Sequence, residues 1–126
     1  FHYAFLQGSS LSGRVCGGNI RCTLKLTGTP WQPDPTGRVL FLESYSGSFA
    51  RMETMLHQYR QMEMFSRCSG VLLELAEKQQ LPTLYRLVQD IIDDPALPIA
   101  VTTELGHQPE AHCLAYEGIR LEGSQL

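Results

Sequence analysis

Three short apolar runs, separated by segments with helical spacing, constrain the fold of this chain most. The runs are Val39–Leu42, Val71–Leu75 and Pro98–Val101. A short apolar run between turn signals favours a strand that is buried on both faces, as in a parallel sheet covered by helices. Strands of this kind that alternate with helices predict an α/β layer architecture.

The segments between the apolar runs carry the spacing of amphipathic helices. Over Phe49–Phe65, apolar residues recur at steps of three and four, which predicts one long helix. A second helix is predicted to begin at Pro82, whose ring suits the first helical turn, and to stop before Pro95. A shorter helix precedes the first strand, with Asn19 as its expected N-cap and Gly28 as its expected stop.

The remaining segments are expected to form loops and one hairpin. Residues 8–13 are small and polar, and residues 28–37 hold three prolines and two glycines, so both stretches are predicted to be loops. Residues 114–116 and 119–121 flank a Glu-Gly pair and predict a terminal β-hairpin. An antiparallel hairpin beside parallel strands makes the predicted sheet mixed.

Composition and charge narrow the class of protein further. A chain of 126 residues fits one domain, and no apolar run approaches the roughly 20 residues that cross a bilayer. The net charge of −3 argues against a general nucleic-acid binder, which would carry a basic face. Four cysteines without CxxC spacing or a secretory signal are expected to be reduced, in a cytoplasmic protein. Because the sequence starts at Phe1, we expect it to be processed or to be a piece of a longer protein.

Two residues are candidates for catalysis. Glu43 directly follows the first apolar strand, which would hold its carboxylate at the rim of the sheet. His107 lies in a polar loop after the third strand, between Gly106 and Pro109, and a loop imidazole can act as a general base near neutral pH. A carboxylate that orients an imidazole would supply two members of a hydrolase triad. The simpler interpretation is a solvated carboxylate at a strand end and a surface histidine.

The sequence offers no clear nucleophile that would complete such a triad. Residues 8–13 resemble the G-x-S-x-G elbow, but Ser12 stands where the second glycine should be, and no strand is expected before it. A metal site built from His107, His112 and Cys113 is a weaker alternative. These residues lack the paired short spacing of structural zinc sites, so no metal and no cofactor is predicted.

Two further residues are candidates for contact with a substrate. Asn19 either caps its helix or reaches into the active-site cleft. Trp31, in the proline-rich loop, either stacks on a ligand ring or covers the edge of the core. Gly17 and Gly18 indicate either a close approach of the backbone at an interdomain cleft or a plain turn.

Several short motifs, taken in order, resemble the C-terminal domain of one peptidase family, the LD-carboxypeptidases. They are Gly17-Gly18-Asn19, Gly28-Thr29-Pro30, the run Val39–Glu43, and Pro98-Ile99-Ala100 followed by Gly106-His107. Residues 51–58 look like a degraded form of a helix motif of the same family. The resemblance covers most of residues 13–121.

The resemblance implies a fold, an activity and a missing partner. Residues 1–126 are expected to form a single C-terminal domain of the swivelling β/β/α type, a mixed sheet flanked by helices. The family members are serine peptidases with a Ser-Glu-His triad, in which Glu43 would be the carboxylate and His107 the base. The serine belongs to an N-terminal domain that this sequence lacks, so the chain alone is expected to be inactive. Asn19 and Trp31 are the candidates for substrate binding.

The resemblance also implies a substrate class with alternatives. The family cleaves the bond to the terminal D-alanine of cytosolic muropeptides in peptidoglycan recycling, usually as a homodimer. For this chain, its charge and apolar runs predict no nucleic-acid and no membrane partner. One branch instead cleaves microcin-type peptide–nucleotide conjugates and confers self-immunity. Ser44 replaces the family's usual aspartate, Glu74 a common glycine, and residues 116–118 a proline-containing turn, so the substrate stays open. A non-catalytic binding or dimerisation module of the same fold is a further alternative.

Overall fold

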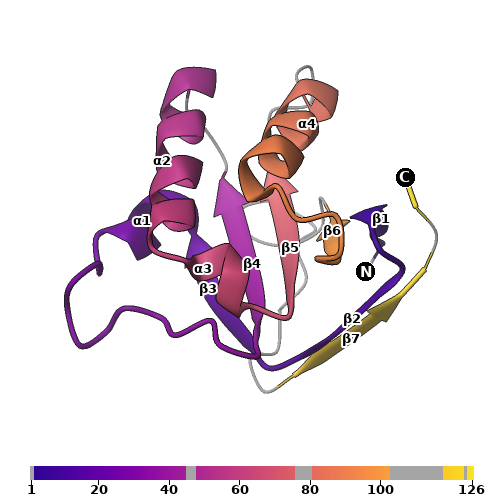
Figure 1. Ribbon diagram of the computed structural model, residues 1–126, viewed down its shortest axis with the longest axis horizontal. Coiled ribbons are helices and arrows are strands. Elements are labelled where there is room, and N and C mark those ends of the chain that lie inside the picture. The colour runs from indigo at the N-terminus through magenta and orange to yellow at the C-terminus, as the bar shows by residue number, and fades with distance from the viewer. Residues whose placement is uncertain (1, 45–47, 76–80, 103–117, 124) are drawn as a thin grey trace.

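The centre of the domain is a mixed β-sheet with the strand order β1-β6-β5-β4-β3 (Figure 1). The computed structural model describes residues 2–44, 48–75, 81–102, 118–123 and 125–126. Within these residues, β3 to β6 run parallel, and β1 pairs antiparallel with β6. The five strands are β1 (Ala4–Gln7), β3 (Val15–Asn19), β4 (Val39–Ser44), β5 (Gly70–Leu75) and β6 (Ile99–Val101).

The three strands predicted from apolar runs are confirmed as the middle of this sheet. Every residue of β4, β5 and β6 is buried, as expected for parallel strands that are covered on both faces. In β4, Leu40 and Leu42 pack in the cluster on the helix side, whereas Val39 and Phe41 belong to the cluster on the opposite side. Because successive side chains of a strand point to opposite faces, β4 contributes residues to two separate hydrophobic cores.

The stretch predicted as a loop over residues 8–13 contains a strand, so that prediction is wrong. β2 (Ser10–Gly13) pairs antiparallel with β7 (Ile119–Glu122), and the two form a separate ribbon (Figure 1). Leu11 is the buried residue of β2, so the local sequence carries little apolar signal. The second arm of the predicted terminal hairpin becomes β7, whose described partner is β2; residues 114–116 lie outside the described residues. The sheet is mixed because of β1.

The ribbon, the sheet and the helices form three layers. Leu11 of β2 and Leu121 of β7 pack with Phe41 and Leu72 on one face of the sheet. The helices cover the other face (Figure 1), and Leu56, Tyr59 and Val88 are among the helical residues that pack in its core. The layering confirms the predicted fold class, a mixed sheet flanked by helices in a β/β/α arrangement. The helices are α1 (Ile20–Leu24), α2 (Phe49–Gln61), α3 (Met64–Arg67) and α4 (Leu81–Ile92).

Two helices differ from the sequence-based boundaries. The long helix predicted over Phe49–Phe65 is interrupted at Glu63, which adopts the left-handed conformation with a φ of 60°. Arg67 bridges the break, since its guanidinium donates to the carbonyls of Met62 and Glu63. The first helix ends at Leu24 and continues as turns toward Gly28. The fourth helix is confirmed and ends before Pro95.

Candidate active site

Polar residues line up across the carboxyl ends of the parallel strands. Asn19 on β3 is in register with Glu43 on β4, and Glu43 with Glu74 on β5. Thr102 follows Val101, which is in register with Leu73, so it continues the row beside Glu74. The carboxyl edge of a parallel sheet is where α/β proteins usually place their functional groups.

Glu43 occupies the position that the sequence predicts for it, at the carboxyl end of β4. Its side chain shares the sheet face of Val39 and Phe41 by strand alternation and is 5% exposed. The amide Nδ2 of Asn19 donates a hydrogen bond to Glu43 Oε2 over 3.2 Å. The interpretation of Glu43 as a solvated carboxylate is therefore wrong, because its side chain is buried and accepts a hydrogen bond from the protein.

Asn19 caps its helix, which is one of the two alternatives that the sequence left open, and its amide also contacts Glu43. Its side-chain oxygen Oδ1 accepts the backbone N–H of Cys22 over 3.0 Å, which caps α1. Its Nδ2 reaches the carboxylate of Glu43. A substrate contact of Asn19 stays a prediction.

Gly17 and Gly18 belong to β3 and do not form a plain turn, and the close approach of the backbone at Gly17 is to β4 inside the sheet. Gly17 has a φ of +102°, and a Cβ at this position would overlap the carbonyl oxygen of Phe41 on β4. Only glycine fits so tight a contact between β3 and β4 without moving one of them. Two residues later, the same pair of strands brings Asn19 beside Glu43.

Glu74 is a residue whose position next to Glu43 sequence reasoning missed. It is 4% exposed and lies one strand away from Glu43, on the same face. The signal was present in the sequence, because Glu74 follows Val71–Leu73 much as Glu43 follows Val39–Leu42. Both acids therefore lie at the same level of two neighbouring parallel strands, and Glu74 brings a second carboxyl group to the carboxyl edge of the sheet.

The beginning of the chain lies at the same edge of the sheet. Because β1 runs antiparallel to β6, its first residues meet the end of β6. The Thr102 hydroxyl donates to the backbone carbonyl of His2 over 2.8 Å. Tyr3 in turn donates its hydroxyl to the carbonyl of Glu122 over 2.7 Å, which ties β1 to the ribbon. The row of polar residues is thus flanked by the start of β1.

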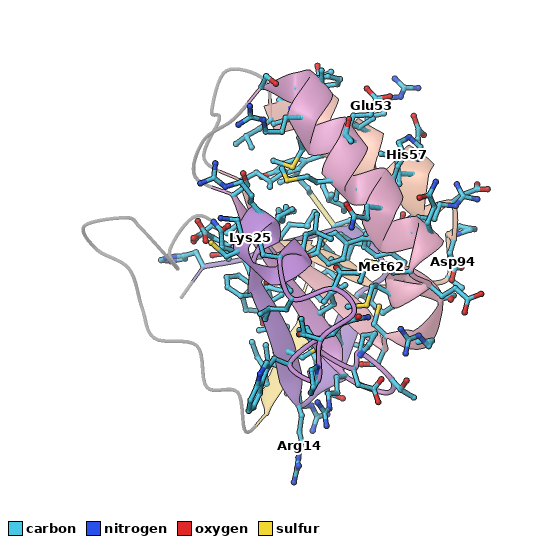
Figure 2. All side chains as sticks on the ribbon, turned by 90° about the vertical axis from the view of Figure 1, so that its left-hand side faces the viewer. Arg14, Lys25, Glu53, His57, Met62 and Asp94 are labelled. Atoms are coloured by element: carbon cyan, nitrogen blue, oxygen red, sulfur yellow. The ribbon has the colours of Figure 1, made fainter. Side chains whose placement is uncertain are left out.

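Other sequence candidates lie outside this row or outside the described residues. His107 and the metal candidates His112 and Cys113 belong to residues 103–117, which are outside the described residues. His57, to which the sequence assigns no role, is exposed on the outer side of α2 (Figure 2). Ser12 is exposed on β2, in register with Arg120.

Trp31 is 77% exposed, so its ring does not cover the edge of the core. The loop that carries Trp31 is attached to the end of α2, where the hydroxyl of Thr27 donates a hydrogen bond to the sulfur of Met62 (Figure 2). Further along, Asp34 pairs with Arg67 over 3.4 Å. Stacking of Trp31 on a substrate stays a prediction.

Three of the four cysteines lie in the part of the chain that the structure describes. Cys16 and Cys68 are buried free thiols, and burial raises the pKa of both. Cys22 is free and exposed on α1. Among the described residues, no three His, Cys, Asp or Glu side chains gather as metal ligands would, and no described helix is long and apolar enough to cross a membrane.

Comparisons with known proteins agree with the motifs and the layers. Residues 12–120 match the family described as the LD-carboxypeptidase C-terminal domain. The chain is 27% identical over 107 residues to slr1534 of Synechocystis sp., which carries the name of a carboxypeptidase, covering 80% of this chain and 36% of that protein. It is 24% identical over 111 residues to the microcin C7 self-immunity protein MccF of Escherichia coli, covering 82% and 32%.

The fold has solved counterparts. An MccF-like protein from Bacillus anthracis superposes with a TM-score of 0.81 at 19% identity, over 97% of this chain and 40% of that one. MccF itself superposes with a TM-score of 0.74 at 21% identity, over 95% and 36%. The chain thus spans about a third of the length of its two curated relatives. Since the family match covers most of the sequence, the chain belongs to the LD-carboxypeptidase C-terminal domain family.

Proposed function

We propose that this chain supplies the glutamate and the histidine of a serine peptidase whose nucleophile lies on polypeptide outside the 126 residues. Glu43 orients the imidazole of His107, and His107 accepts the proton of the serine hydroxyl. The single observation that carries the proposal is the buried carboxylate of Glu43, held at the carboxyl edge of the sheet by Asn19, in a member of a peptidase family.

In the proposed reaction, the serine oxygen attacks the carbonyl carbon of the scissile amide while its proton moves to the imidazole. The imidazolium then gives that proton to the departing amine, and water hydrolyses the acyl-enzyme by the same route. Glu43 accepts a hydrogen bond from the imidazole and stabilises the imidazolium. A carboxylate that is 5% exposed interacts more strongly with that cation than one in water, because the surrounding dielectric is lower.

The test is hydrolysis by a protein that carries this chain together with the serine-bearing domain. Glu43→Gln and His107→Gln are each expected to lower kcat by about a thousandfold or more, because triad members act as a unit. The matched controls are Glu53→Gln and His57→Gln on the outer side of α2, which should keep full activity (Figure 2). Full activity of both site variants would overturn the proposal in favour of a non-catalytic module of this fold.

For the substrate, we propose a peptide whose terminal D-alanine follows an L-centre, as in cytosolic muropeptides. The relative slr1534 carries a carboxypeptidase name, which supports this class. MccF, at a similar identity, supports the alternative, a microcin-type peptide–nucleotide conjugate, since a solved structure of MccF holds aspartyl sulfamoyl adenosine. Comparing kcat/KM for a muropeptide tetrapeptide and for an aminoacyl sulfamoyl nucleoside decides between them. The cytoplasmic location and the homodimer stay predictions, which fractionation and light scattering would test.

The isolated chain provides a further test of the proposal that the nucleophilic serine lies outside the 126 residues. Without the serine-bearing domain, we expect no hydrolysis above the rate in buffer, because the nucleophile is missing. Hydrolysis by the 126 residues alone, lost on changing Ser10 or Ser12, would place the nucleophile within the chain and contradict the proposal.

A further inference from the structure

We infer that Asn19 is a positioning residue for Glu43. Its hydrogen bond to Oε2 fixes the orientation of the carboxylate, and with it the direction of Oε1. The inference rests on the proposed function, since it gives Asn19 a role through the triad glutamate. It differs from the expectation that Asn19 binds substrate.

The two hydrogen bonds of Asn19 fix the orientation of its amide group. The backbone N–H of Cys22 can only donate, so the atom that receives it must be Oδ1. The amide nitrogen then points away from α1, toward Glu43 Oε2 at 3.2 Å. A carboxylate oxygen accepts and an amide N–H donates, so this orientation of the amide forms a hydrogen bond from Nδ2 to Oε2.

The support for Asn19 is itself fixed by packing. Ile20, the first residue of α1, is fully buried, and its backbone carbonyl accepts the hydroxyl of Tyr59 over 3.2 Å. On the other side, Gly17 allows β3 to approach β4 closely. A side chain held between a fixed helix start and a close strand pair cannot easily follow a rotation of the Glu43 carboxylate.

Asparagine is the side chain that can satisfy both contacts. Aspartate keeps an oxygen for the cap of α1 but brings a second negative charge to Glu43. Serine also caps, but its hydroxyl ends one bond short of the position of Nδ2. Comparing these variants separates the cap, which both retain, from the donation to Glu43, which both lose.

The consequence for catalysis lies in the second carboxylate oxygen. With Oε2 held by Asn19, rotation of the carboxylate about its terminal bond is restrained, and Oε1 keeps one direction for the imidazole. Removing a charge-assisted hydrogen bond of this kind is expected to lower kcat by about tenfold to a hundredfold. KM is expected to stay within about twofold, because the lost contact is not with the substrate.

The experiment measures kcat and KM for Asn19→Ser, Asn19→Asp and Glu43→Gln, and for the double variant Asn19→Ser with Glu43→Gln, in the protein that includes the serine-bearing domain. If Asn19 acts through Glu43, the double variant is no slower than Glu43→Gln alone, since the two residues then form one unit. Thermal unfolding of Asn19→Ser should stay close to that of the unchanged protein, because serine still caps α1.

Two results would overturn the inference while leaving the proposed function standing. One is a raised KM with unchanged kcat in Asn19→Ser, which marks a substrate contact. The other is a double variant whose loss is the product of the two single losses. Full activity of Glu43→Gln is a different outcome, because it overturns the proposed function together with the role of Asn19.

Discussion

The hydroxyl of Tyr59 on α2 donates to the backbone carbonyl of Ile20 over 3.2 Å, at the point where β3 turns into α1. Both residues are fully buried. The contact joins the longest described helix to Ile20, the residue that follows Asn19. It therefore links the helical layer directly to the row of polar residues at the sheet edge. Burial raises the pKa of Tyr59 to about 12, which keeps the hydroxyl protonated and able to donate.

Replacing Tyr59 by phenylalanine removes this hydrogen bond and keeps the ring. We expect the free energy of unfolding to fall by about 1–2 kcal/mol, because a buried carbonyl loses its side-chain donor. Urea denaturation of the isolated chain measures the change. Tyr85→Phe on α4 is the control, since the pKa of this buried tyrosine is raised by burial alone. Equal losses in the two variants would contradict a specific role for the contact with Ile20.

We expect the buried thiol of Cys68 to make the folded protein less stable in alkaline solution. Burial raises the pKa of its thiol from 9.0 to about 11, so the unfolded chain loses this proton at lower pH than the folded one. The thiol's contribution to stability is therefore complete below pH 9 and is lost as the pH rises toward about 11, a change of the order of 3 kcal/mol. Denaturation midpoints between pH 8 and about 11 should fall less steeply in Cys68→Ala.

The control for this experiment is Cys22→Ala, because Cys22 is exposed on α1. It should leave the slope of stability against pH as it is in the unchanged chain. Equal slopes for Cys68→Ala and the unchanged chain would show that the buried thiol does not set the alkaline limit.

The middle of the sheet could be predicted from the sequence, and its borders could not. Strands β4 to β6 are buried on both faces, so their residues are mostly apolar whichever way they point, up to Glu43 in β4 and Glu74 in β5, and each run is visible locally. In contrast, β2 has one buried residue, and β3 ends in Gly17-Gly18-Asn19, which has the composition of a turn. The pairing of β2 with β7 joins residues more than a hundred positions apart, which no local pattern contains.

The candidate site divides in the same way. The place of Glu43 at a strand end followed from the run before it, and the capping by Asn19 from its place before Ile20. Their contact did not follow, because it depends on the register of β3 against β4, and β3 was not recognised as a strand. The neighbouring position of Glu74 was missed for a related reason, since two strand ends meet only once the sheet order is known.

Gly17 and Gly28 separate steric overlap from backbone strain. Both have a positive φ, but a Cβ at Gly17 would overlap the carbonyl oxygen of Phe41, whereas a Cβ at Gly28 meets nothing within 4 Å. We expect Gly17→Ala to lower the free energy of unfolding by about 3 kcal/mol or more, and Gly28→Ala by about 1 kcal/mol. Urea denaturation of both variants checks the difference. Similar losses would mean that β3 moves away from β4 at little cost.

The break between α2 and α3 predicts that one substitution has opposite effects at two sites. Glu63 has a φ of 60°, a conformation that costs a residue with a Cβ roughly 1 kcal/mol relative to glycine. Glu63→Gly should therefore raise the free energy of unfolding by up to about 1 kcal/mol, since its backbone carbonyl still accepts from Ser66 and Arg67. Glu53→Gly, inside α2 (Figure 2), should lower it by about 1 kcal/mol. Destabilisation by both variants would show that the Glu63 side chain contributes more than its strained backbone costs.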